Sequence, residues 1–163
     1  LLLQAFVSGR FFTHKLNLLI MLDTAIKIVT EAFKDKKDKA GKPYLGHLER
    51  VSSKLSNESE EVKTIAILHD ILEDCPEWDK DKLLEFFPNR VVKAVECLTH
   101  KKGQSYEDYI SQVMTNELSI IVKIEDLKDN MDFTRLDIKG WLVFKLTANV
   151  QGFVMLWHWQ HKR

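Results

Sequence analysis

The chain has 163 residues, with 24 basic and 24 acidic side chains and a hydrophobic fraction of 45%. This length predicts one domain with a buried core, and this composition excludes a globally disordered chain. Residues 21–136 hold 18 basic and 23 acidic side chains, a net charge of −5. An acidic domain lacks the basic face that a general nucleic-acid binder needs.

The cysteine content and the N-terminal hydropathy indicate the cellular compartment and whether the chain enters a membrane. Cys75 and Cys97 are the only cysteines, and they form neither a metal-binding spacing nor a disulfide framework. We therefore expect reduced thiols and a cytoplasmic protein. The apolar N-terminal stretch is interrupted by Arg10, His14 and Lys15, so it contains no run of about 18 apolar residues. No basic segment precedes the first apolar run and no small-residue cleavage site follows the second, so it does not fit a signal peptide. We therefore expect a soluble chain.

Helical spacing of apolar residues predominates along the chain, and strand signals are nearly absent. Asp23 is the predicted N-cap of a helix that ends near Phe33, and a lysine-rich loop follows over residues 34–42. A capping signal at Ser56 or Asn57 precedes a helix over about 60–74. Further helices are predicted over 47–55, 79–87, 90–98, 105–114 and 117–131. The pattern predicts an all-α bundle with short connections.

The chain divides into three predicted segments. Residues 1–20 precede Met21 as an N-terminal extension, and residues 21–136 form the domain that carries the candidate site. The C-terminal segment, 137–163, holds three of the four tryptophans. Its apolar residues could form one helix over about 141–157, which either closes the bundle or is a tail unrelated to it.

One short segment of the chain concentrates polar groups that can bind a cation. His69 and Asp70 lie near the end of the predicted 60–74 helix, and helical geometry places Glu73 and Asp74 one turn beyond them. An imidazole and up to three carboxylates therefore project toward a common edge. The two later acids would also fit a solvated helix end.

Two more candidate ligands come from distant parts of the sequence. Asp126 lies on the predicted 117–131 helix, in a polar stripe with Lys123 and Asn130 beside the apolar stripe. His47 opens a helix after Pro43-Tyr44-Leu45-Gly46. Taken singly, these residues also fit a charged helix flank and a helix cap. Together with His69 and Asp70, they make a set of two imidazoles and two carboxylates, which can hold one divalent cation.

Three sequence segments, in this order and at this spacing, resemble the HD superfamily. They are Gly41-Lys42-Pro43-Tyr44 followed by His47, then Leu68-His69-Asp70-Ile71-Leu72-Glu73-Asp74, then Lys123-Ile124-Glu125-Asp126-Leu127-Lys128-Asp129-Asn130-Met131. Within the superfamily the chain is most similar to the hydrolase domain of RelA/SpoT-type enzymes, which cleave the guanosine alarmones (p)ppGpp. The resemblance covers about residues 22–136 and implies an HD-domain helical bundle.

The resemblance also implies roles for individual residues. The implied ligands of one divalent cation, usually Mn²⁺, are His47, His69, Asp70 and Asp126. Glu73 and Asp74 correspond to the acidic pair of hydrolytically competent members, and one of them would orient or deprotonate the attacking water. Lys39, Tyr44 and Asn130 correspond to residues that contact the nucleotide or border it. A mixed imidazole and carboxylate set suits Mn²⁺ or Fe²⁺ better than a thiolate-rich zinc site does.

The sequence departs from the family pattern at four positions that are not metal ligands. The family usually carries His and Arg at the positions of Phe33 and Asp38, and Arg and His at those of Leu127 and Asp129. Losing an arginine weakens bidentate phosphate recognition. Two alternatives therefore stay open: an HD phosphohydrolase acting on another nucleotide or phosphorylated cofactor, and a degenerate HD domain that binds nucleotide without turnover. We expect a small-molecule nucleotide as partner, and neither nucleic acid nor a membrane; the sequence does not predict the oligomeric state.

Overall fold

The fold is entirely helical in the part of the chain that the computed structural model describes. That part comprises residues 2–38, 41–132, 150, 152 and 154–156, with side chains from residue 17 onward. It contains no strand, so the all-α prediction is confirmed. The helices are α1 (Leu2–Ala32), α2 (Leu45–Lys54), α3 (Glu60–Leu68), α4 (Ile71–Asp74), α5 (Lys80–Leu84), α6 (Asn89–Leu98), α7 (Tyr106–Val113) and α8 (Glu117–Asn130).

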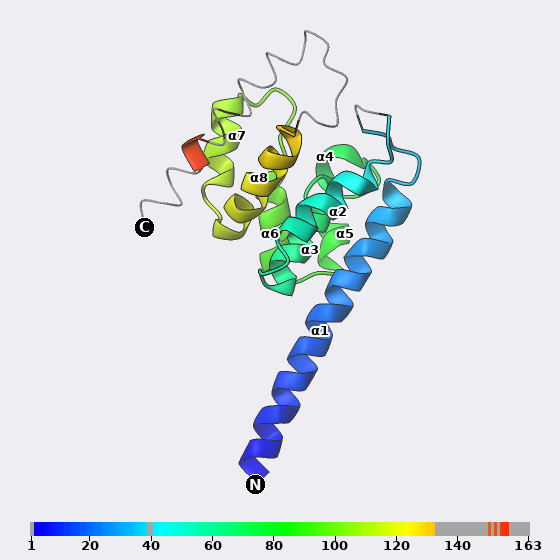
Figure 1. Ribbon diagram of the computed structural model, residues 1–163, viewed down its shortest axis with the longest axis vertical. Coiled ribbons are helices and arrows are strands. Elements are labelled where there is room, and N and C mark those ends of the chain that lie inside the picture. The colour runs from blue at the N-terminus through cyan, green and yellow to red at the C-terminus, as the bar shows by residue number, and fades with distance from the viewer. Residues whose placement is uncertain (1, 39–40, 133–149, 151, 153, 157–163) are drawn as a thin grey trace.

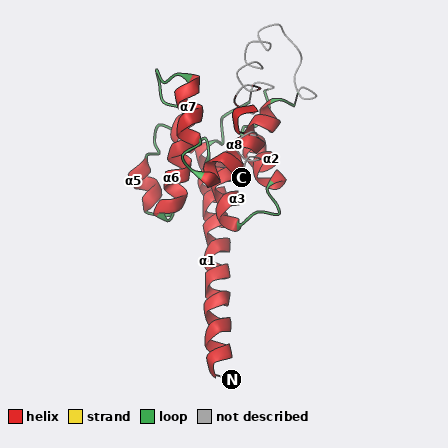
Figure 2. Cartoon of the chain, turned by 90° about the vertical axis from the view of Figure 1, so that its left-hand side faces the viewer, coloured by secondary structure: helices red, strands yellow, loops and turns green. Residues whose placement is uncertain are grey.

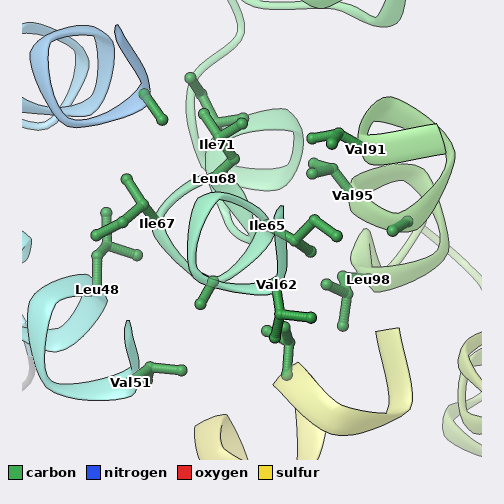
Figure 3. Close-up of a cluster of buried hydrophobic side chains, with 14 of the residues drawn as sticks. Leu48, Val51, Val62, Ile65, Ile67, Leu68, Ile71, Val91, Val95 and Leu98 are labelled. Atoms are coloured by element: carbon green, nitrogen blue, oxygen red, sulfur yellow. The ribbon is translucent and has the colours of Figure 1, made fainter. Parts of the chain in front are cut away.

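Helix α3 forms the centre of the hydrophobic core. In the close-up of Figure 3 its side chains point toward α2 on one side and α6 on the other. Leu48 of α2 and Val95 of α6 are fully buried, as are Ile65 and Leu68 of α3. Burying one such aliphatic side chain stabilises a fold by about 1.5–3 kcal/mol. The end of α3, where the candidate site begins, is therefore anchored in the buried core.

Helix α1 is longer than the sequence analysis predicted. It runs from Leu2 through the expected boundary at residue 20, so Asp23 lies inside the helix and is not its N-cap. The leucines and other helix-forming residues upstream let the helix continue in that direction. Ala25 and Val29, which follow one another at i and i+4, are fully buried. Figures 1 and 2 show the N-terminal half of α1 projecting away from the other helices.

No described helix, α1 included, is both long enough and apolar enough to span a membrane.

The predicted 60–74 helix is interrupted in the structure. Helix α3 ends at Leu68 and α4 begins at Ile71, with His69 and Asp70 between them. The N-cap of α3 is Ser59, whose side chain accepts a hydrogen bond from Val62 N–H at 3.3 Å. The predicted caps at Ser56 and Asn57 were therefore wrong, because Ser59 stands immediately before the helix with the extended backbone that an N-cap requires.

Backbone hydrogen bonds shape the loop between α1 and α2. Asp38 N–H donates to Lys42 O at 2.7 Å, and Tyr44 N–H donates to Lys36 O at 2.9 Å. Gly41 makes the turn with a φ of +76°, a conformation that favours glycine. These contacts bring Tyr44 to the start of α2. Lys39, which the sequence analysis assigned to the substrate, lies outside the described residues.

Only a few residues of the C-terminal segment are described. Residues 150, 152 and 154–156 are helical, and Leu156 is fully buried. Gly152 packs so closely against α7 that a Cβ atom there would lie 2.4 Å from the Tyr106 hydroxyl. The rest of the helix predicted over 141–157 lies outside the described residues.

Candidate metal centre

Two buried histidines present the same ring nitrogen to one point in the interior. His47 lies in the first turn of α2 and His69 follows α3 directly; they are 6% and 2% exposed. His47 Nδ1 lies 2.8 Å from Asp129 Oδ2, and His69 Nδ1 lies 2.7 Å from the carbonyl oxygen of Ala66. Each acceptor places the N–H at Nδ1 and leaves Nε2 as the atom that can bind a metal.

Two carboxylates complete a set of oxygen and nitrogen donors around these Nε2 atoms. Asp126 Oδ1 lies 3.2 Å from His47 Nε2 and 3.7 Å from His69 Nε2. Asp70 Oδ2 lies 3.1 Å from His69 Nε2 and 3.7 Å from His47 Nε2. Ligands that bind one cation at about 2.1 Å lie about 3 Å apart when they are neighbours in an octahedron. The observed separations match that arrangement.

One atom of this cluster supports a cation more directly. His69 Nε2 is buried and forms no hydrogen bond within the described part of the chain, although Asp70 Oδ2 lies 3.1 Å away. A buried polar atom without a partner is rare in folded proteins, and a metal ion would satisfy this one. Donor atoms of His47, His69 and Asp126 all lie within 4.8 Å of one another. This buried group is therefore consistent with a metal site, and its donors fit a divalent cation.

The break between α3 and α4 explains how two adjacent residues reach the same point. Neighbouring side chains on a regular helix point about 100° apart, and the turn at Asp70 changes that relation. Asp70 has φ −101° and ψ 0°, a turn conformation, and its Oδ2 accepts a hydrogen bond from the Tyr44 hydroxyl at 2.6 Å. The site thus depends on a local departure from the helix that the apolar spacing predicted.

Asp126 is held in its ionised form by residues one turn away on α8. Lys123 Nζ donates to Asp126 Oδ2 at 2.7 Å, and Asn130 Nδ2 donates to Asp126 Oδ1 at 2.6 Å. Burial alone would raise the pKa of Asp126, but the Lys123 ammonium and the two imidazoles hold that pKa well below its ordinary value of 3.8. Asn130, predicted to contact the substrate, is placed against this carboxylate.

The sequence analysis missed the role of Asp129, which it considered only as a departure from the family pattern. Asp129 is 1% exposed and contacts His47 from the side opposite the candidate cation. Arg50 Nε and Lys54 Nζ each donate to Asp129 Oδ1, at 3.1 and 3.2 Å. The spacing offered a signal, because His47, Arg50 and Lys54 recur at i, i+3 and i+7 on α2.

The two acidic residues of α4, Glu73 and Asp74, contact different partners. Glu73 Oε2 accepts a hydrogen bond from the backbone N–H of His100 at 2.9 Å. Burial raises the pKa of Glu73 above its ordinary value of 4.5, although the His100 N–H opposes that rise. Asp74 forms an ion pair with Lys36 at 3.2 Å, and Lys36 also donates to the Asp74 carbonyl. The two acids therefore differ, since within the described residues Asp74 forms an ion pair with a lysine and Glu73 does not.

The similarity to known proteins is one of three-dimensional structure. The chain matches no model of a known protein family and no curated protein sequence. It does match a solved structure described as "A metazoan ortholog of SpoT hydrolyzes ppGpp and plays a role in starvation responses". The TM-score is 0.70 at 19% sequence identity, over 83% of this chain and 84% of that chain. The expected all-helical fold is thus confirmed: this chain shares the fold of that solved structure.

Proposed function

We propose that this protein is a metal-dependent phosphohydrolase that removes the 3′-pyrophosphate from (p)ppGpp. The observation that carries the proposal is the convergence of His47 Nε2 and His69 Nε2 on two carboxylate oxygens, one from the buried Asp126 and one from the half-buried Asp70. The similarity in fold to a protein described as hydrolysing ppGpp supports the same substrate class.

In this proposal His47, His69, Asp70 and Asp126 hold one divalent cation, which we assign as Mn²⁺. Imidazole nitrogens and carboxylate oxygens together are suited to that ion, and four protein ligands leave two positions of an octahedron open. A cation bound there supplies Lewis acidity toward a phosphate oxygen and toward the attacking water.

Glu73 is the residue we assign to proton transfer. Its Oε2 is held by the His100 N–H, which leaves Oε1 to orient a water molecule and accept its proton. A carboxylate whose pKa is raised by burial is a better base than an ordinary one. The water oxygen joins phosphorus, the bond to the ribose 3′ oxygen breaks, and that oxygen takes up a proton. The products are pyrophosphate and GDP or GTP.

Substrate contacts are assigned to Lys39, Tyr44 and Asn130. The Tyr44 hydroxyl and the Asn130 amide each touch one proposed ligand carboxylate, so both border the place where a substrate phosphate would bind. Lysines of the loop before α2, such as Lys36 and Lys42, would attract a polyphosphate electrostatically.

A second candidate is the same hydrolysis with another nucleotide or a phosphorylated cofactor as substrate. The observation that favours it is Asp38, which stands where the family usually has arginine and accepts a hydrogen bond from Lys42 N–H at 2.9 Å. A carboxylate cannot replace an arginine in binding phosphate.

The test is incubation of the purified protein with ppGpp and Mn²⁺, with an EDTA control, followed by anion-exchange separation of the products. We expect GDP and pyrophosphate, and no product with EDTA. Turnover of other phosphorylated nucleotides but not of ppGpp would favour the second candidate. Guanine-nucleotide binding without metal and without any turnover would contradict both candidates and favour a degenerate binding domain.

A further inference from the structure

A cavity on the outer side of α6 shares no lining residue with the metal centre. Its volume is about 610 Å³, within the range of small-molecule sites, and it opens between α5, α6 and the end of α7. Both ribbon views place α6 between α5 and α7 (Figures 1 and 2). Trp78 and Leu72, which also pack against the core, supply its apolar surface.

The charged groups of this cavity leave two ammonium groups available. Lys80 Nζ pairs with Glu96 Oε2 at 3.0 Å, and the Asp79 side chain caps α5. By contrast, Lys93 and Lys101 line the cavity and form no ion pair within the described part of the chain. An aromatic and aliphatic surface beside ammonium groups is suited to an organic anion with a planar ring.

The cavity wall is also connected to Glu73. Gln112 lines the cavity, and its Nε2 donates to the carbonyl oxygens of Cys97 and Thr99 at 3.0 and 3.1 Å. His100 directly follows Thr99, and its backbone N–H donates a hydrogen bond to Glu73 Oε2. The segment that forms the wall on one side therefore positions the proposed base on the other.

We propose that this cavity binds a small organic anion, with a planar apolar ring and a carboxylate or phosphate group, and that its occupancy moves the Thr99–His100 segment. The effect of that movement on catalysis rests on the proposed function of Glu73. Binding of the anion, and the movement of the segment, do not.

Cys97 allows the binding step to be measured directly. It lines the cavity and is partly exposed, whereas Cys75 is buried and burial raises its pKa to about 11. The thiol reagent 5,5′-dithiobis(2-nitrobenzoate) is an aromatic carboxylate, and 4,4′-dithiodipyridine is a neutral aromatic disulfide. We compare the rate constant of the anionic reagent at Cys97 with that of the neutral reagent, as the ratio of the first to the second. We expect the Lys93→Gln/Lys101→Gln variant to lower this ratio by about fivefold.

A matched variant controls for net charge. Lys27 and Lys128 lie on α1 and α8 and do not line the cavity, so Lys27→Gln/Lys128→Gln loses the same charge elsewhere. We expect that variant to keep the native ratio within about twofold, since distant exposed charges are screened. An equal fall in both variants, or no fall in either, would overturn the proposal. Protection of Cys97 by salicylate or by GMP would tell a carboxylate ligand from a phosphate ligand.

The mixed disulfide that 5,5′-dithiobis(2-nitrobenzoate) forms with Cys97 tests the connection between the cavity and the metal centre. The nitrobenzoate group attached to Cys97 occupies the cavity, and we expect it to change hydrogen exchange of the His100 amide by at least about threefold. The reagent should leave exchange unchanged in Cys97→Ser. Unchanged exchange in the adduct would refute the movement of this segment, whether or not the protein hydrolyses ppGpp. If ppGpp hydrolysis is found, the adduct should also have an altered kcat.

Discussion

Asp129→Asn tests how the metal centre is supported. The native carboxylate accepts from His47 Nδ1 through Oδ2 and from Arg50 Nε and Lys54 Nζ through Oδ1. An asparagine has one acceptor oxygen instead of two and carries no charge, so it weakens the contacts with His47 and with the two cations. Losing the partner of a ligating histidine typically weakens metal binding by 10- to 100-fold. We expect Mn²⁺ binding weaker by about 1.4–2.7 kcal/mol.

The same substitution should have a smaller effect on folding. The side chains of Arg50 and Lys54 are 34% and 38% exposed, so both can turn toward water when the carboxylate is lost. We therefore expect the free energy of unfolding of the metal-free protein to fall by only about 1–2 kcal/mol.

Titration calorimetry of the metal-free protein with Mn²⁺, together with thermal unfolding, measures both effects. Glu125→Gln is the matched control, because Glu125 lies on the same helix and is paired with Lys128. A Mn²⁺ affinity of Asp129→Asn within twofold of the native value would refute a positioning role for Asp129.

Three further predictions concern the ligands and the base. Glu73→Gln should bind Mn²⁺ like the native protein and lower kcat by about 10²- to 10⁴-fold, and an unchanged kcat would remove Glu73 from proton transfer. Asp70→Asn and His69→Ala should each abolish stoichiometric Mn²⁺ retention in metal analysis after gel filtration; full retention by either would exclude that residue as a ligand. Burial lowers the pKa of His47, but Asp126 and Asp129 raise it more, so the folded pKa lies above 6.5. Stability from the charged imidazole is complete below pH 6.5 and lost as pH rises through the raised pKa. Between pH 6.5 and 9 the Tm of the metal-free protein should therefore fall, while the Tm increase caused by Mn²⁺ should grow, because the metal binds neutral imidazole. A Mn²⁺ effect that shrinks with rising pH would contradict ligation by histidine.

Much of the fold could be predicted because local patterns and burial agree. Helices α6, α7 and α8 lie within a few residues of their predicted ranges, and Ser105, where the predicted 105–114 helix begins, is the N-cap of α7. The end predicted for α3, near residue 74, was wrong because Ile71 and Leu72 continue the apolar spacing through the turn at Asp70. That turn is stabilised by distant contacts such as the Tyr44 hydroxyl, which a local pattern does not contain.

Part of the candidate site could likewise be predicted from the sequence, and part could not. The resemblance in sequence pointed to two histidines and two aspartates, and in the structure each of these carboxylates lies within 3.7 Å of both imidazole Nε2 atoms. It did not identify the contact of Asp129 with His47, because these residues are 82 positions apart and meet only when α2 packs against α8. Nor could it place the Asn130 amide on Asp126, a contact that requires side-chain geometry.

The most direct test of the metal centre is electron spin-echo envelope modulation of Mn²⁺ bound to the purified protein at one equivalent. We predict ¹⁴N couplings from two directly bound imidazoles, reduced to one in His69→Ala supplied with excess Mn²⁺. Mn²⁺ bound with no ¹⁴N coupling, or with couplings unchanged in His69→Ala, would contradict a cation held between His47 and His69.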